Sequence, residues 1–157
     1  MKRVFITMCA AAIALAFTSC KEEEQSSLDL GALQKTTVKG TVYYDVTDKD
    51  GDVETKAIPS GTTVYLDLIV NGNVVKTYTA TTDASGKYSI ELPASNGVSV
   101  SATAFVSFEG TNYEYDSEEN EYVKKNFLFK GDGSTSITPN ATSVINFEAT
   151  STLLDIL

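Results

Sequence analysis

The sequence predicts an all-β protein whose single domain is an antiparallel β-sandwich of seven or more strands. Apolar and polar residues alternate with a period of two through most of the chain after Thr36, as they do in strands that are buried on one face only. Clusters of Gly, Asn, Asp and Pro separate these runs, and no long stretch has a helical period. Many short strands joined by Gly-rich turns are typical of a β-sandwich.

Each expected strand places its apolar residues on one face, which we expect to form the core. The expected strands, in chain order, are 36–46, 62–70, the hairpin partner that follows Gly72, 86–92, 98–108, 112–115, 122–129 and 142–149. The expected core residues of four of these runs are Val38, Val42, Tyr44 and Val46, then Val64, Leu66, Leu68 and Val70, then Tyr88, Ile90 and Leu92, then Val98, Val100, Ala102, Ala104, Val106 and Phe108.

One hairpin register follows from the turn chemistry. Asn71-Gly72 is the preferred pair for a two-residue type I′ turn, because both central positions need a positive φ. A turn centred on this pair would set Ile69 opposite Val74, Leu68 opposite Val75, Asp67 opposite Lys76 and Tyr65 opposite Tyr78. Val75 and Thr77 are then expected on the core face, beside Leu66 and Leu68.

The first residues have the pattern of a secretory signal. Lys2 and Arg3 precede an apolar run over 4–16, and the small polar pair Thr18-Ser19 follows. The run is shorter than the ~20 residues that span a bilayer. We therefore divide the chain into a signal peptide (1–19), an acidic tether (20–35) and a β-sandwich domain (36–157).

Cys20 directly follows this segment, and the arrangement resembles the lipobox of bacterial lipoproteins. Phe17 stands where that family favours Leu. The resemblance implies that Cys20 is acylated and anchors the mature chain in outer-membrane lipid. The following Lys21-Glu22-Glu23-Glu24 resembles the acidic signal of lipoproteins that gut anaerobic diderms export to the cell surface. It implies a domain that faces the cell exterior, whereas the alternative is a plain solvated tether.

Composition excludes several classes of function. The net charge of −9 becomes −11 when the signal is removed with Lys2 and Arg3, so the chain should repel nucleic acid. The sequence has no histidine, which removes Ser-His-Asp and Cys-His catalysis and histidine-ligated zinc. Cys9 leaves with the signal and Cys20 would carry lipid, so neither a disulfide nor a free thiol is expected. We therefore expect a protein that is not an enzyme.

Two clusters are candidate binding sites. The first comprises Asp48, Asp50, Asp52 and Glu54, which alternate around a Gly turn and could supply oxygen ligands to calcium. The alternative is a solvated hairpin tip, where Asp and Gly are favoured for backbone reasons. The only cofactor considered is therefore calcium, and the default expectation is none.

The second candidate cluster comprises Tyr113, Tyr115 and Tyr122, which lie on or beside the strands expected at 112–115 and 122–129. Tyrosine rings can stack on sugar rings, so these residues are candidate ligand contacts. The alternative is that they pack within the sheet. The apolar end 153–157 could complete a strand, dock on the domain or contact a partner.

Residues 38–108 resemble the carboxypeptidase regulatory-like domain, a transthyretin-like (prealbumin-like) β-sandwich. The matching segments are Gly40-Thr41-Val42, Pro59-Ser60-Gly61, the run from Thr82 to Ile90, Leu92-Pro93, and a closing strand at 144–148. The resemblance implies that Asp83 caps a turn, that Gly86 supplies a positive φ, and that Tyr88 and Ile90 enter the core. The expected fold is thus a transthyretin-like or Ig-like sandwich, and many relatives of the carboxypeptidase regulatory-like domain are accessory or extracellular modules without catalysis.

These observations predict a non-catalytic, lipid-anchored surface module that binds a protein or glycan partner, as an accessory to a larger envelope complex. The alternatives are a structural or adhesive subunit that associates with itself, and a module stabilised by calcium.

Overall fold

The computed structural model describes residues 29–154, and all of its regular elements are strands. The prediction of an all-β protein is confirmed. No helix in this part of the chain has the length and apolar character needed to cross a membrane. The strands are β1 (Gln34–Thr47), β2 (Val53–Ala57), β3 (Thr63–Val70), β4 (Asn73–Thr81), β5 (Lys87–Ala94), β6 (Val100–Asp116), β7 (Glu121–Ser136), β8 (Thr142–Val144) and β9 (Phe147–Leu153).

The predicted signal peptide, Cys20 and the acidic run lie outside the described residues. Within them, the last part of the expected tether is already structured, because β1 begins at Gln34 and pairs there with Ala94 of β5.

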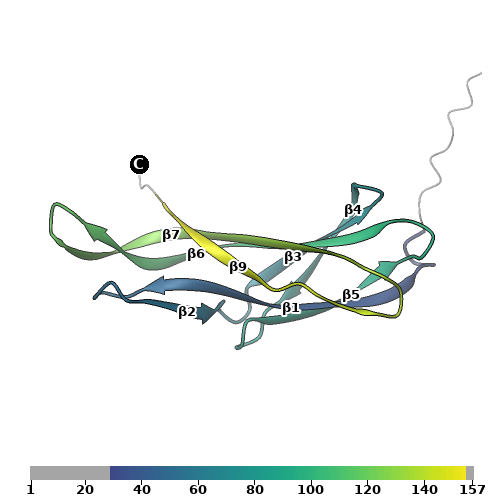
Figure 1. Cartoon of the computed structure of the whole chain (residues 1–157), viewed down its shortest axis with the longest axis horizontal. Helices are drawn as coiled ribbons and strands as arrows, with labels where there is room; N and C mark the ends of the chain where they lie inside the picture. Colours follow the sequence, from purple (N-terminus) through teal and green to yellow (C-terminus); the bar gives the residue numbers. More distant parts are fainter. Residues whose placement is uncertain (1–28, 155–157) are drawn as a thin grey trace, which may run out of the picture.

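Hydrogen bonds join the strands into one open mixed sheet with the order β2-β1-β9-β7-β6-β3-β4, and β5 and β8 also pair with β1. Figure 1 shows β1, β2 and β5 running along one side of the molecule and β3, β6 and β7 along the other, with β9 passing from the first side to the second. The expectation of purely antiparallel pairing is wrong, because β8 and β9 both run parallel to β1. The period of two sets which face a residue occupies, but it does not set the direction of the neighbouring strand.

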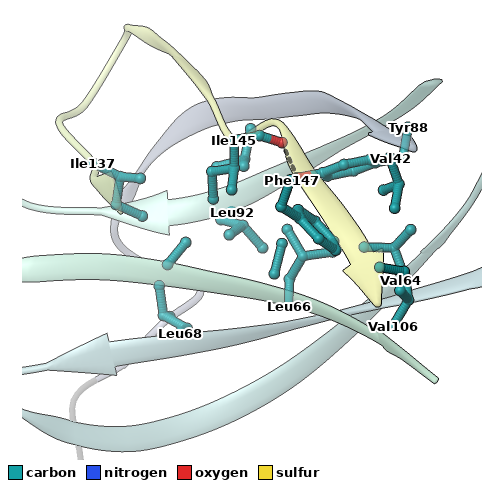
Figure 2. Close-up of a cluster of buried hydrophobic side chains, with 14 of the residues drawn as sticks. Val42, Val64, Leu66, Leu68, Tyr88, Leu92, Val106, Ile137, Ile145 and Phe147 are labelled. Carbon is teal, nitrogen blue, oxygen red and sulfur yellow. Dashed lines mark hydrogen bonds between the residues drawn. The ribbon is translucent and has the colours of Figure 1, made fainter. Parts of the chain in front are cut away.

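The core lies between these two sides. The alternate residues expected to be buried in β1, β3, β5 and β6 are buried or half-buried, so the predicted faces are confirmed. Figure 2 shows Leu92, Ile145 and Phe147 gathered with Leu66 and Val106. Buried members of the core are Val38, Val42, Ile58, Val64, Leu66, Leu68, Val70, Tyr88, Leu92, Ala94, Val100, Ala102, Ala104, Val106, Phe127, Phe129, Ile137, Ile145, Phe147 and Ala149.

The three runs expected as separate strands at 98–108, 112–115 and 122–129 form two long strands, and the run expected at 142–149 is divided between β8 and β9. β6 continues through Gly110 to Asp116 and pairs with β7 along its whole length from Ser101. Gly110 does not interrupt the strand. Its missing side chain makes room for the Phe129 ring, whose Cε2 lies 3.0 Å from the position a Cβ would occupy. The additional strand pair expected at 112–115 and 122–129 is therefore the outer end of the β6–β7 hairpin.

The β3–β4 hairpin confirms the predicted turn but only the first part of the predicted register. Asn71 and Gly72 have φ values of 49° and 83°, and Ile69 pairs with Val74 as expected. A bulge between Leu68 and Ile69 then shifts the pairing by one residue. The observed pairs beyond it are Leu68 with Lys76, Asp67 with Thr77, Leu66 with Tyr78, and Tyr65 with Thr79.

The bulge decides which side of β4 faces the core. Val75, expected inside, is 43% exposed, whereas Tyr78 and Ala80 pack against the core beside their partners Leu66 and Val64. Without the bulge, the polar residues on the other side of β4 would face the core. The gain from burying Tyr78 and Ala80 thus explains why the register departs from the regular hairpin.

The turn before β5 has the structure that the family resemblance implies. Asp83 Oδ1 accepts hydrogen bonds from the backbone N–H groups of Ser85 (2.8 Å) and Lys87 (2.9 Å). Gly86 has φ 70°, and a Cβ there would lie 2.6 Å from the Val42 carbonyl oxygen. The capping role of Asp83 and the glycine requirement are therefore confirmed as local structure.

One buried hydrogen bond holds the β8–β9 connection against β1. The Tyr88 hydroxyl donates to the Ile145 carbonyl oxygen at 2.8 Å, drawn as a dashed line in Figure 2. The two groups meet over Gly40, where a Cβ would lie only 1.8 Å from that same oxygen. Burial raises the pKa of the Tyr88 hydroxyl, so it remains a donor at physiological pH. Gly40 thus allows the close approach that Tyr88 then fixes.

We predict that Tyr88→Phe lowers the free energy of unfolding by about 1–3 kcal/mol, because it leaves the buried Ile145 carbonyl without its donor. Urea unfolding followed by circular dichroism measures the change. Tyr43→Phe is the matched control, since Tyr43 is 42% exposed, and should change the value by less than ~0.5 kcal/mol. Equal effects of the two substitutions would contradict the role given to Tyr88.

Candidate functional site

An aromatic pair, one ring exposed and the other half-buried, lies on the outer face of β3 and β6. Tyr65 and Phe105 are cross-strand partners, and their rings stack with centroids 5.3 Å apart and an interplanar angle of 17°. Tyr65 is 39% exposed. Both residues alternate with core residues, so their strands hold the two rings on the face away from the core.

Short polar side chains surround this pair. Thr79 of β4 lies opposite Tyr65, and Asp132 of β7 lies opposite Phe105. In the next row along the sheet, Asp67 lies between Thr77 and Thr103, and the Thr77 hydroxyl donates to Asp67 Oδ1. Because directly paired residues share a face, all of these groups lie on the same side of the sheet as the two rings. We call this surface the aromatic face.

The aromatic face offers two kinds of contact at once. The two aromatic rings provide a local apolar surface, and the surrounding hydroxyls and carboxylates donate and accept hydrogen bonds. A sugar ring has the matching chemistry, with C–H groups on its faces and hydroxyls at its edge. The face therefore suits a polyhydroxylated ligand better than a purely apolar one.

The sequence contained only part of the signal for this site. Alternation placed Tyr65 and Asp67 on the outer face of their strand, and the same parity places Phe105 outside. The predicted partner of Tyr65 was Tyr78, however, and the bulge moves Tyr78 to the core face. The stack on Phe105 depends on the register between β3 and β6, which are separated by two other strands in the sequence.

The three tyrosines predicted as ligand contacts lie near the tip of the β6–β7 hairpin. Tyr115 and Tyr122 are cross-strand partners whose rings meet edge to face at 5.4 Å. The Tyr115 hydroxyl donates to Asn120 Oδ1 at 2.7 Å, and Tyr113 is half-buried. These contacts are intrasheet packing, although Tyr115 remains 50% exposed.

The structure does not bring the four predicted carboxylates together. Asp48 Oδ1 accepts the backbone N–H groups of Asp50 (2.9 Å) and Asp52 (3.0 Å). Asp50 pairs with Lys49, and Glu54 pairs with Lys56 at 3.1 Å. Within residues 29–154, no group of three or more acidic, histidine or cysteine side chains could hold a metal ion. The observed loop is a hairpin tip organised by its own backbone hydrogen bonds.

The two clusters pack against each other, which the sequence did not predict. Tyr122 covers Gly51 at the tip of the β1–β2 hairpin, where a Cβ would lie 2.5 Å from the ring. The buried Asn112 of β6 accepts the Thr47 backbone N–H through Oδ1 at 2.6 Å. Gly51 has φ 86° and could not carry a side chain without strain. Through these contacts, the ends of the β1–β2 and β6–β7 hairpins stabilise each other.

Three aspartates hold turns through the same interaction. Backbone N–H groups lower the pKa of Asp48, Asp83 and Asp116, because each carboxylate accepts hydrogen bonds that favour its charged form. The donors to Asp116 are the N–H groups of Glu118 and Glu119. The carboxylates of Asp48 and Asp83 are exposed, and that of Asp116 is half-buried beside Lys125.

A shallow groove of about 540 Å³ lies over β1, β5 and the β8–β9 connection. Its lining mixes polar and apolar surface, and its charged members are Lys39, Lys87 and Asp83. The sequence did not indicate it, because its residues come from four separate segments. The predicted lipid site, Cys20, lies outside the described residues. At the other end, Leu153 completes β9 by pairing with Phe127 and packs against the core.

Comparisons with known proteins show no family. No family model matches the chain, and none of the curated proteins matches it. One solved structure with a similar arrangement is that of a Pseudomonas aeruginosa protein for which carbohydrate binding has been suggested. It is 10% identical, covers 73% of this chain and 89% of its own, and gives a TM-score of 0.38. A likeness of this strength establishes neither a family nor a ligand.

We predict that acid destabilises the protein through Asp48, Asp83 and Asp116. Their pKa values in the folded chain lie below those of the unfolded chain. Their stabilisation is therefore fully present above the unfolded pKa of ~3.9 and is lost as the pH falls through the folded pKa. The triple variant with Asn at these positions keeps the hydrogen-bond acceptors but does not titrate. Its urea midpoint should fall less than that of the wild type between pH 5 and pH 2.

A control variant carries Asp50→Asn, Glu54→Gln and Glu109→Gln. In the described part of the chain, these three carboxylates accept no backbone hydrogen bond. The control should therefore follow the acid profile of the wild type. A control profile that is as flat as that of the Asn variant would show that general charge repulsion, and not the capped turns, sets the acid sensitivity.

Proposed function

We propose that the protein is a non-catalytic binding module that takes a glycan on the aromatic face. The observation that carries the proposal is the exposed Tyr65 ring stacked on Phe105 at 5.3 Å, surrounded by hydroxyl and carboxylate side chains. The absence of histidine from the sequence supports a role without catalysis. The proposal requires no cofactor, and it assigns the Tyr113, Tyr115 and Tyr122 cluster to support of the hairpin ends.

A glycan fits the aromatic face better than a protein partner. Protein interfaces have a sizeable apolar centre within a polar rim. Here the apolar centre is limited to Tyr65, Phe105 and the half-buried Ile69, and the remaining neighbours are short polar residues such as Thr79 and Thr103. Single sugar rings match a platform of this size, and the hydroxyls of the sugar match the surrounding donors and acceptors.

We further propose that the strands form a transthyretin-like or Ig-like sandwich. The support is that buried side chains of β1 and β5 face those of β3 and β6 across one core. The turn at Asp83–Tyr88 also has the contacts that the resemblance to carboxypeptidase regulatory-like domains implies. In this arrangement β9 links the two layers, since it pairs with both β1 and β7.

The location proposed for the module rests on the sequence of its N-terminal segment. Lys2 and Arg3, the apolar run over 4–16 and Cys20 support acylation and anchoring in the outer membrane. The acidic run at 22–24 supports exposure on the cell exterior. A lipid-anchored domain at that surface would meet extracellular glycans directly, as an accessory to a larger envelope complex.

Self-association is the second candidate function. The strand order ends at β2 and β4, and exposed edges can pair with another chain. Val53 on β2 and Val74 on β4 are 63% and 58% exposed. The bulge at Val75 of β4 and the adjacent Lys76 both oppose pairing at that edge. Glycan binding therefore has the stronger support.

We predict that Tyr65→Ser weakens glycan binding by about fivefold or more, because it removes the exposed half of the stacked pair. The probes are immobilised xylan, mannan, galactan and β-glucan, and retardation of the full chain in affinity gels measures binding. Tyr115→Ser is the matched control, since Tyr115 is also exposed but lies at the hairpin tip. It should bind as the wild type does.

Failure of every probe to retard the wild-type chain would contradict the glycan proposal. Sedimentation velocity of the same samples then tests the second candidate. A size that grows with protein concentration would support self-association, and a monomer at all concentrations would contradict it.

We predict that protease treatment of intact cells removes the domain, because the proposed anchor leaves it outside the outer membrane. A variant in which Glu22, Glu23 and Glu24 are alanine should be protected, since it lacks the acidic run. Immunoblots of shaved cells measure both. Full protection of the wild type would place the domain in the periplasm and would make the run a plain tether.

A further inference from the structure

The groove over β1, β5 and the β8–β9 connection holds two lysines and one aspartate in an otherwise acidic protein. The whole chain has a net charge of −9, yet two lysines, Lys39 and Lys87, line this one groove. In the described part of the chain, Lys35, Lys49, Lys56 and Lys125 form ion pairs, whereas Lys39 and Lys87 form none. Their ammonium groups are therefore available to a ligand.

Strand pairing places these lysines on the same face. Lys39 of β1 is the partner of Ser89 on β5, and Thr41 of β1 is the partner of Lys87. Alternate residues of a strand share a face, as do directly paired residues, so all four side chains lie on one face of the β1–β5 pair. The two lysines lie diagonally across the two strands, and the two hydroxyl groups occupy the other diagonal. All four residues line the groove.

Asn146, in the β8–β9 connection, lines the opposite side of the groove. Its Oδ1 accepts the Thr41 backbone N–H at 2.8 Å, which fixes the amide against β1. The hydrogen bond from Tyr88 to Ile145 holds the adjacent chain, and Gly40 leaves no side chain there. The groove is therefore built on fixed backbone, and its volume of about 540 Å³ lies within the range usual for small-molecule sites.

We propose that this groove binds the anionic group of an acidic saccharide, with Lys39 and Lys87 as the charged contacts. The carboxylate of a uronic acid and the sulfate ester of a sulfated sugar share this chemistry. Thr41 and Ser89 supply hydroxyls to the neutral part of the sugar ring. The lining mixes polar and apolar surface, which matches the hydroxyl edge and the C–H faces of a sugar ring.

Asp83 places a negative charge in the same groove, so its removal tests whether charge governs binding there. It is the acidic member of the lining, and its charge opposes an anion in the groove. Its carboxylate caps the turn through the N–H groups of Ser85 and Lys87. Asparagine can accept the same hydrogen bonds without the charge, so Asp83→Asn should tighten anion binding while leaving the turn in place.

The test is calorimetric titration of the purified full-length chain with oligogalacturonate, with heparin oligosaccharide and with neutral maltohexaose. We expect the acidic probes to bind and the neutral one to bind at least about tenfold more weakly. Lys39→Gln and Lys87→Gln should each weaken the acidic ligands by about three- to tenfold. Lys124→Gln is the matched control, since Lys124 is exposed on β7 away from the groove lining, and it should have no effect. Oligogalacturonate carries carboxylates alone, so its binding would show that a carboxylate is sufficient, whereas binding of heparin alone would show that sulfate is required.

Three results would overturn the proposal: no binding of either acidic probe, equal binding of maltohexaose, or affinities that the two lysine substitutions leave unchanged. Urea midpoints of every variant establish that it is folded. Tyr65→Ser separates this inference from the aromatic face, because it leaves the lysines intact. If only Tyr65→Ser lowered the affinity for the acidic probes, the aromatic face would be their binding site, and the role given to the groove with Lys39 and Lys87 would be contradicted.

Discussion

The close approach of the Ile145 carbonyl to Gly40, fixed by the Tyr88 hydroxyl, is the contact on which the rest of the structure depends. At this point the chain passes from β8 to β9 while remaining beside β1. Its two halves pair with β1 on either side of the contact, in the parallel direction. A larger residue at Gly40 would separate the strands, and the Asn146 amide could no longer satisfy the Thr41 N–H.

This crossing explains how one hydrogen-bonded sheet can enclose a core. β9 pairs with β1 near its start and with β7 near its end, so it joins the two sides shown in Figure 1. Gly131 and Gly133 on β7 lie against β9 and the segment that precedes it. A Cβ at Gly131 would lie 2.3 Å from the Glu148 carbonyl oxygen, and a Cβ at Gly133 would lie 2.9 Å from Ile145 Cγ2. Small residues on both neighbours thus allow the connecting strand to pack closely.

The two candidate binding surfaces are consequences of this arrangement. β3 and β6 must present an outer face once their alternate residues fill the core, and that face carries the Tyr65–Phe105 stack. The lysine groove lies where β1 and β5 meet the β8–β9 connection. At the hairpin ends, the carboxylates of Asp48 and Asp116 accept backbone hydrogen bonds within their own turns.

The sequence by itself determined the features that depend on neighbours along the chain. Alternation assigned the inner faces of β1, β3, β5 and β6, and the short-range chemistry of Asn71-Gly72 and Asp83 set two turns. The tertiary structure alone decided the partners: the bulge that turns Tyr78 inward, the parallel direction of β8 and β9, and the stack on Phe105. A period of two repeats identically along a strand, so it specifies a face but neither the register nor the direction of a distant neighbour. Those are chosen by the packing of the whole core.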